Sequence, residues 1–439
     1  MNQKKTYRTA FIFLTILFFL WGFITVLVDS LIPRLREVFT LSYFQAGMVQ
    51  FAFFGAYFVL SIPAGYILSK IGYKKGIILG LITMAVGSLL FYPAASMRVF
   101  GIFMLAYFML AAGITVLQVA ANPYVTVLGP ERTASSRLNL SQAFNSLGTA
   151  LAPAIGALFI LKDRVMATAE IESLSEAAKT DYYINEAAAV QVPFLGIAGF
   201  IGVIALVFVF VNLPKIGNTA ASNDYLPVLK NRNLMMGAFG IFFYVGAEVA
   251  LGSYMVNYFL SLDLAETVRN TPFMGTIAEW VLNSRITASS DMAVVGVFVT
   301  FYWTGAMIGR FIGSYLTKLI NPAKVLVGFA LGAVTMILIS SFSTGLIAMW
   351  TLIAVGLFNS IMFPTIFSLA LDGLGNDKPQ GSGVLCTMIV GGAIIPPLFG
   401  FLTDSFGFDK AFLIVILCYA YIFFYGYRNK SNKIEATIR

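Results

Sequence analysis

Residues 113–129 read GITVLQVAANPYVTVLG, and the interpretation of the whole chain turns on this stretch. Its apolar side chains are typical of a buried helix, yet Gln118, Asn122 and Pro123 lie near its middle. A polar group in an apolar setting costs about 2–7 kcal/mol when it has no hydrogen-bond partner. The stretch can therefore be understood only once the medium around the helix is known.

The composition identifies that medium as a lipid bilayer. Of the 439 residues, 59% are hydrophobic and 11% are charged, whereas a soluble domain has about 25% charged residues. Apolar runs of about 20 residues, each long enough to cross a bilayer as a helix, recur along the chain. The sequence therefore predicts an all-α membrane protein with no separate soluble domain.

The apolar runs predict twelve transmembrane helices in two pseudo-repeated bundles of six. The expected spans are 9–31, 43–69, 74–96, 99–128, 138–161, 190–213, 233–261, 292–318, 323–344, 346–372, 380–404 and 409–427. A polar stretch separates the sixth span from the seventh. We therefore expect an N-terminal bundle over 1–213, a cytoplasmic linker over 214–232 and a C-terminal bundle over 233–439.

Similar motifs in the two halves support the pseudo-repeat. AGYILSKIGYKKG (64–76) resembles IGSYLTKLINPAK (312–324), and SLGTALAPAIG (146–156) resembles VGGAIIPPLFG (390–400). Repeats of six spans are typical of transporters in which two halves rock around a site at the midplane. The alternative is that Gly and Pro recur in any helical membrane protein.

The distribution of Lys and Arg predicts that both termini are cytoplasmic. Basic residues predominate in the segments that would then face the cytoplasm, beginning with Lys4, Lys5 and Arg8, as the positive-inside rule requires. We attribute the net charge of +8 to contact with anionic membrane lipid rather than with nucleic acid. The run 9–31 is too long for a signal peptide and is expected to be retained.

The chain lacks the side chains that most enzymes and metal sites require. Histidine is absent, and the two cysteines, Cys386 and Cys418, lie inside apolar spans. No metal-ligand spacing and no phosphate-binding loop is found. We therefore expect no metal site, no cofactor and no enzymatic activity, and any proton chemistry must use carboxylates.

Four amides occupy neighbouring spans and are candidates for binding a sugar. Gln118 and Asn122 lie one turn apart, and Gln142 and Asn145 lie three residues apart, so each pair shares a helix face. Amides offer both donors and acceptors, which suits them to sugar hydroxyls. They could instead join helices, because interhelical amide bonds contribute about 0.6–2 kcal/mol.

Two carboxylates inside spans are candidates for coupling transport to a cation. Asp29 follows eighteen uncharged residues, and Glu248 lies about fifteen residues into the seventh span. Inserting a carboxylate at the middle of the bilayer costs about 2.5–3.5 kcal/mol of free energy, so the carboxylate normally faces a cavity or a partner. Alternatively, Asp29 could lie at the interface beside Arg34 or Arg36, and Glu248 could pair with Arg310.

The second half carries two further amides inside spans. Asn257 lies nine residues after Glu248, and Asn359 lies in the tenth span. We include both among the predicted sugar ligands, because a site at the midplane would receive groups from both halves.

Several motifs together resemble the major facilitator superfamily, specifically its fucose–galactose–glucose:proton symporter branch. They include FFLWGF, FQAGMVQ, AANPYVTVLGPE, RLNLSQAFNSLG, YVGAE, FPTIFSLAL and GGAIIPPLFGF, and the resemblance runs from about residue 18 to 426. QVAANPYVTVLG with YVGAEVALGSYMVNY is most similar to the glucose/galactose transporter subgroup.

The resemblance implies roles for two positions. In fucose permeases of this branch, a first-span aspartate and a fourth-span glutamate are associated with sugar binding and proton coupling. Asp29 matches the aspartate, but Gln118 stands where the glutamate is expected, and an amide cannot titrate. Three possibilities follow: Asp29 couples alone, Glu248 supplies a second carboxylate, or sodium replaces the proton.

The resemblance implies that the chain imports glucose or galactose, with fucose as another candidate, together with a proton. We expect a monomer in a bacterial inner membrane, working by alternating access, with sodium as the alternative cation. A drug or metabolite exporter is a rival, but such pockets tend to be aromatic and apolar, and the amides argue against it. A membrane-embedded enzyme and a channel are the other rivals.

Overall fold

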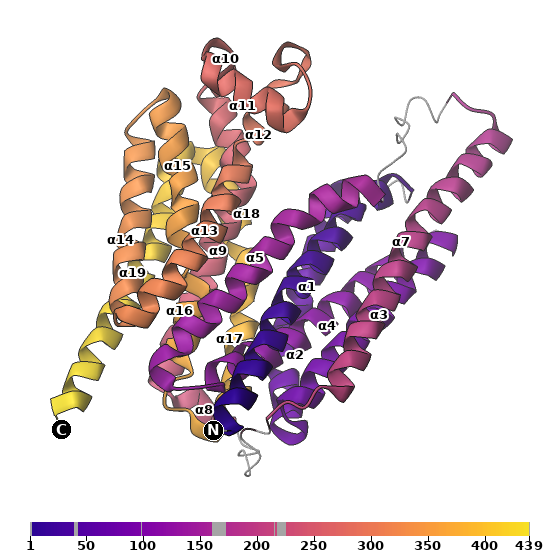
Figure 1. Ribbon diagram of the computed structural model, residues 1–439. Coiled ribbons are helices and arrows are strands. Elements are labelled where there is room, and N and C mark those ends of the chain that lie inside the picture. Colours follow the sequence, from indigo (N-terminus) through magenta and orange to yellow (C-terminus); the bar gives the residue numbers. More distant parts are fainter. Residues whose placement is uncertain are drawn as a thin grey trace. The chain divides into compact units, whose positions relative to one another are not determined.

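The computed structural model describes residues 2–38, 43–97, 99–159, 173–214, 216 and 225–438, and every regular element in these ranges is helical (Figure 1). The first helices are α1 (Asn2–Val38), α2 (Tyr43–Ile71), α3 (Tyr73–Met97), α4 (Phe100–Val127), α5 (Ala134–Phe159), α7 (Glu176–Phe210) and α8 (Leu226–Lys230). They are followed by α9 (Arg232–Ser261), α10 (Leu264–Asn270), α11 (Pro272–Leu282), α12 (Asp291–Gly296), α13 (Val299–Leu319) and α14 (Pro322–Ser341). The last are α15 (Gly345–Asn359), α16 (Met362–Ala370), α17 (Lys378–Thr387), α18 (Gly391–Phe406) and α19 (Phe408–Ile438).

The helices confirm the expected membrane spans. In the described residues, 11 stretches are long and apolar enough to cross a bilayer, and each overlaps one of the twelve predicted ranges. The remaining prediction, 138–161, coincides with α5, and its last two residues lie outside the described part of the chain. Helix α5 is less apolar than its neighbours because its first half carries serine, asparagine and glutamine side chains.

Local sequence signals explain where several helices begin and break. The side chain of Asn231 accepts a hydrogen bond of 2.9 Å from the Leu234 N–H and caps α9. Helix α4 continues through Pro123. In contrast, the tenth span is divided into α15 and α16 after Asn359, at Ser360 and Ile361.

The chain forms two compact units, each described here by itself. Unit 1 comprises Met1–Gly129, Phe144–Val228 and Gly373–Thr387, and unit 2 comprises Pro130–Ala143, Leu229–Asp372 and Met388–Arg439. The unit boundaries therefore cut through α5, and they place α17 in unit 1 with the helices of the N-terminal half. The cytoplasmic linker predicted over 214–232 contains α8, and residues 215 and 217–224 lie outside the described part of the chain.

Unit 1 is built on close contacts between α2, α3, α4, α7 and α17. Small residues permit these contacts: a Cβ added at Gly113 of α4 would lie 2.3 Å from Met84 N of α3. A Cβ added at Gly383 of α17 would lie 2.6 Å from Ser61 O of α2. Helix α17 is further fixed by Ser382, whose hydroxyl donates to Val119 O of α4 at 2.8 Å. These contacts leave no room for larger side chains at the two glycines.

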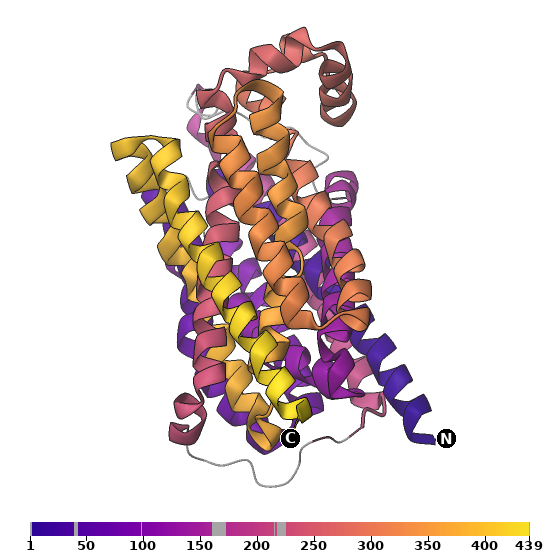
Figure 2. The same cartoon turned by 90° about the vertical axis from the view of Figure 1, so that its left-hand side faces the viewer.

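Unit 2 packs α14 beside α15 and α19, as both views show (Figures 1 and 2). The beginning of α5 joins this unit through reciprocal hydrogen bonds with α13. Ser136 Oγ donates to Ser314 O at 2.7 Å, and Ser314 Oγ donates to Ser136 O at 3.0 Å. One residue on, burial lowers the pKa of the Arg137 guanidinium to about 10, so Arg137 keeps its charge at neutral pH.

One part of unit 2 differs from the sequence-based expectation. Residues 262–290 were expected only to connect the seventh span to the eighth, but they fold into α10, α11 and the 3₁₀ turn Ile286–Ala288. The two helices have 7 and 11 residues. They are too short to produce the long apolar runs by which spans are recognised.

Candidate functional site

Gln118 and Asn122 lie inside α4 and are buried in unit 1. The exposed fractions are 9% for Gln118 and 0% for Asn122. The side-chain oxygen of Gln118, Oε1, has no hydrogen-bond partner within the described residues. A buried acceptor without a partner costs about 1–3 kcal/mol. An incoming hydroxyl that donated to Gln118 Oε1 would recover this free energy.

The packing of α4 explains why Gln118 does not bond to a neighbouring helix. Gly113 and Leu117 lie on the face that contacts α3, where a Cβ added at Gly80 would lie 2.7 Å from Leu117 N. Successive helical residues are turned by 100°, so Gln118 and Asn122 lie 100–180° away from that face. The close contacts at Gly80 and Gly113 thus fix α4 against α3, whereas its two amide side chains lie on a face that points away from α3.

The other amide pair lies on α5 and is divided between the two units. In unit 1, Asn145 Nδ2 donates to Phe18 O of α1 at 2.9 Å, and a Cβ added at Gly22 would lie 2.7 Å from the same Nδ2. Asn145 therefore helps to join α1 to α5. Gln142 belongs to unit 2 and is 6% exposed. Asp29 lies in α1, but its side chain is outside the described part of the structure.

Glu248 lies half-buried in unit 2 and accepts one hydrogen bond. Tyr244, one turn earlier on α9, donates its hydroxyl to Glu248 Oε1 at 2.7 Å. Arg310 of α13 acts electrostatically on the Glu248 carboxylate, but the two side chains form no direct ion pair within the described residues. The Nε of Arg310 instead donates to Ser360 O at 3.2 Å. The alternative of a direct Glu248–Arg310 ion pair is thus not observed in the part of the chain that the structure describes.

Pro364 explains why Ser360 O is available to Arg310. A carbonyl group in a helix accepts the amide proton of the residue four positions later, but residue 364 is a proline and has no N–H. Arg310 Nε donates to this carbonyl oxygen instead. The span thereby supplies a polar partner from its backbone.

Asn359 forms the centre of a buried network that connects three helices. Its side chain is 0% exposed. Its Nδ2 donates to Tyr302 Oη of α13 at 2.7 Å, and its Oδ1 accepts from Tyr419 Oη of α19 at 2.6 Å. Asn359, Tyr302 and Tyr419 thus form a buried polar cluster in unit 2, and Glu248 lies near both tyrosines.

Asn257 lies outside this cluster. Its side chain is exposed, whereas the cluster is buried. Nine residues separate it from Glu248, which turns it by about 180° around α9. Whether it contacts a substrate stays a prediction.

The tyrosines that bond to Glu248 and Asn359 differ in how readily they can be predicted from the sequence. Tyr244 precedes Glu248 by four residues, so the helical period alone brings the two together. Tyr302 and Tyr419 are 57 and 60 residues from Asn359 in the chain. Their contacts depend on how three helices pack, which no local pattern records.

Comparison with known proteins identifies the family to which this chain belongs. Residues 10–385 match the family described as Major Facilitator Superfamily. The chain belongs to the major facilitator superfamily. The predicted resemblance and the all-helical fold are thus confirmed.

Relatives within the superfamily cover nearly the full chain. The chain is 47% identical to the glucose/galactose transporter of Brucella abortus biovar 1 (strain 9-941), over 97% of this chain and 95% of that protein. It is 36% identical to the L-fucose-proton symporter of Escherichia coli (strain K12), over 97% of this chain and 94% of that one. The chain is a transporter, as the sequence predicted, rather than an enzyme.

Solved structures of superfamily members support the same fold. A crystal structure of the major facilitator superfamily transporter FucP in the outward conformation matches with a TM-score of 0.85 and 34% sequence identity. The match covers 97% of this chain and 99% of that one. The superfamily fold therefore extends over essentially the whole protein.

Proposed function

We propose that this transporter imports glucose or galactose together with a proton by alternating access. The observation that carries the proposal is the relation, along nearly the full chain, to a protein named a glucose/galactose transporter. The more distant relation to an L-fucose-proton symporter supports the proton as the coupling ion. L-Fucose is the sugar against which specificity should be compared.

Gln118 is the sugar ligand that the geometry supports best. Its Oε1 is buried without a partner in the described residues, so a sugar hydroxyl that donates to it replaces no existing bond. We propose Asn122 and Gln142 as further ligands, since both are buried amides. Asn257 is proposed from its exposed amide.

Asn145 and Asn359 are proposed to act near the sugar through the helices they fix. Asn145 already donates to the α1 backbone. Both ends of the Asn359 amide are bonded to tyrosines. A sugar hydroxyl could bind to Asn359 only by displacing one of them. We therefore propose that Asn359 positions the helices around Glu248.

Asp29 and Glu248 are proposed as the coupling carboxylates. In the described residues, Glu248 is bonded to a hydroxyl rather than to a cation. It can therefore accept a proton without breaking an ion pair, and the Tyr244 hydroxyl can serve as donor or acceptor. Protonation removes a charge from an apolar medium, which favours the movement of the loaded transporter. Sodium is the alternative cation, because carboxylate and amide oxygens suit hard cations.

We propose that the protein is a monomer in a bacterial inner membrane, in contact with anionic lipid and with both termini in the cytoplasm. The support is the distribution of basic residues along the sequence, including Lys70, Lys74 and Lys75 between the second and third spans.

The test is uptake of labelled sugar into proteoliposomes. We expect an inwardly directed proton gradient to drive accumulation of glucose and galactose in the absence of sodium. A protonophore should abolish this accumulation. Each unlabelled sugar, including L-fucose, is then tested as a competitor at fixed pH. Accumulation that requires a sodium gradient and ignores the pH gradient would assign coupling to sodium. No uptake of any hexose under either gradient would refute the proposed function.

A further inference from the structure

The segment between the seventh and eighth spans is an ordered element with a surface of its own. All of residues 262–290 are described. Helix α10 packs against α9, α12 and α15, and α11 packs against α10 and α12. The segment is therefore part of the fold of unit 2 and holds a defined position on it (Figure 1).

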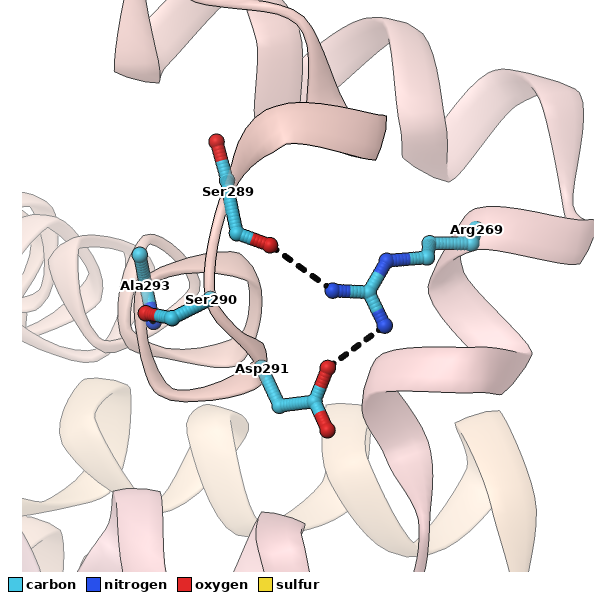
Figure 3. A network of polar contacts seen from close by, with 5 residues as sticks. All are labelled: Arg269, Ser289, Ser290, Asp291 and Ala293. Carbon is cyan, nitrogen blue, oxygen red and sulfur yellow. Dashed lines mark hydrogen bonds and ion pairs between the residues drawn. The ribbon is translucent and has the colours of Figure 1, made fainter.

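Polar contacts fix this segment at both ends. Arg269 of α10 pairs with Asp291 of α12, and its second guanidinium nitrogen donates to Ser289 O at 2.9 Å (Figure 3). Glu279 of α11 accepts a hydrogen bond of 3.0 Å from the Ile286 N–H. Arg269 and Glu279 thus hold the two helices in place.

Helix α11 carries large aromatic side chains on its outer face as well as apolar residues on its packed face. The exposed Thr276 lies between the aromatic residues, and its hydroxyl donates to Pro272 O at 2.9 Å. Met274, Gly275 and Ala278 are buried. On the opposite side, the exposed fractions of Phe273 and Trp280 are 71% and 82%. These two residues are seven positions apart and therefore lie on one stripe. In water, this stripe would leave two large aromatic side chains uncovered.

Helix α10 provides the contrast within the same segment. It buries Leu264, Ala265 and Val268 and exposes Glu266. This is the ordinary pattern of a helix with one face on the protein and the other in water. The apolar outer stripe is therefore a property of α11 and not of the whole segment.

The neighbouring spans place α11 at a bilayer surface. The segment joins the end of the span Arg232–Ser261 to the beginning of the span Asp291–Leu319. These ends lie on the same side of the membrane, with two residues between Ser261 and α10 and eight between α11 and Asp291. Tryptophan is enriched at the membrane–water interface, where its apolar ring meets lipid and its N–H meets water.

We propose that α11 lies in the lipid headgroup region of the leaflet where α9 ends, with Phe273 and Trp280 inserted toward the acyl chains. The occupant of the apolar stripe is phospholipid. Because α10 packs against α9, this anchor sets the depth in the membrane of the helix that carries Glu248.

The test uses single cysteines labelled with an environment-sensitive fluorophore. Cys386 and Cys418 are both buried, so a maleimide should react with introduced residues, and the unmodified chain measures the background. The probes are Trp280→Cys and Phe273→Cys, and Glu266→Cys on α10 is the matched control. Thermal unfolding in detergent, compared with that of the unmodified chain, verifies that each labelled variant is folded. Each variant is then reconstituted in phosphatidylethanolamine–phosphatidylglycerol vesicles.

We expect the fluorophores at positions 273 and 280 to emit at shorter wavelength than the one at position 266. Nitroxide-labelled phospholipid should quench them strongly and aqueous iodide weakly, with the reverse at position 266. Iodide quenching at position 280 equal to that at 266 would overturn the proposal. Protection from both quenchers would also overturn it, because a second protein chain or a lid would then cover the stripe. Neither thermal unfolding nor quenching depends on sugar transport, so failure of the proposed function leaves this test intact.

Discussion

Gln118 in unit 1 and Asn359 in unit 2 are buried amides in apolar spans, yet they have different surroundings. Asn359 has a tyrosine hydroxyl on each end of its amide, whereas the oxygen of Gln118 has no partner in the described residues. Burial alone therefore does not distinguish a structural amide from a ligand-binding one. The distinction lies in whether the hydrogen-bonding capacity is already used.

The helices that carry these amides have one feature in common. Each has a carbonyl group whose partner four residues later is a proline without an N–H: Val119 O, before Pro123, accepts from Ser382, and Ser360 O, before Pro364, accepts from Arg310. The difference between the two regions therefore lies in the side chains. The Asn359 amide has a partner at each end, whereas Gln118 Oε1 has none in the described residues.

The largest effect is expected from removing the titratable groups. In Asp29→Asn and Glu248→Gln, uphill accumulation should be lost while sugar exchange down a gradient remains, because an amide cannot carry a proton. A proton moving through 100 mV supplies about 2.3 kcal/mol, which corresponds to roughly 50-fold accumulation of a neutral sugar. The measurement is the steady-state ratio of internal to external sugar in energised vesicles. Full accumulation by either variant would remove that residue from the coupling role.

The next largest effect is expected when the network of unit 2 is broken. Asn359→Leu leaves the buried hydroxyls of Tyr302 and Tyr419 without this partner, at about 1–3 kcal/mol each. The free energy of unfolding should fall accordingly, as measured by thermal unfolding in detergent.

The control for Asn359→Leu is a triple variant that adds Tyr302→Phe and Tyr419→Phe. Replacing all partners with apolar groups of similar shape leaves no unsatisfied group, so part of the stability should return. A triple variant that is less stable than Asn359→Leu would show that the two tyrosine hydroxyls have stabilising interactions other than those with Asn359.

Gln118 should respond in the opposite manner to Asn359. Gln118→Leu removes a buried acceptor that has no partner, so the free energy of unfolding should stay the same or rise. Sugar affinity should fall by about 1–2 kcal/mol, or roughly 5–30-fold in the half-saturating concentration. Gln118→Glu keeps an acceptor oxygen and serves as the control in uptake assays. If Gln118→Leu lost stability but kept its sugar affinity, Gln118 would be a structural amide rather than a sugar ligand.

The smallest effect is expected from a pair of buried serines, one in each unit. Ser136→Ala removes the hydroxyl that donates to Ser314 O and should cost about 0.5–1.5 kcal/mol of stability. Ser61 is also buried, but its hydroxyl has no partner in the described residues, so Ser61→Ala should be neutral. Thermal unfolding of the two variants side by side measures the difference, and equal losses would contradict the interpretation.

Most of the fold could be predicted from the sequence because a bilayer imposes a simple requirement on each span. A helix must be predominantly apolar over about 20 residues to cross the bilayer, and this requirement is visible without knowing any neighbour. Helices α10 and α11 were not predicted because they do not cross the bilayer. The partners of Asn359 were not predicted because they come from distant positions in the chain.

The sequence by itself determined the membrane spans, the superfamily and the identity of the polar residues that an apolar span would not carry without a reason. Only the tertiary structure decided which of them already have partners. Whether a polar group is satisfied depends on atoms brought within about 3 Å by helix packing. Such contacts join residues far apart in the chain, as Tyr302 and Tyr419 meet at Asn359.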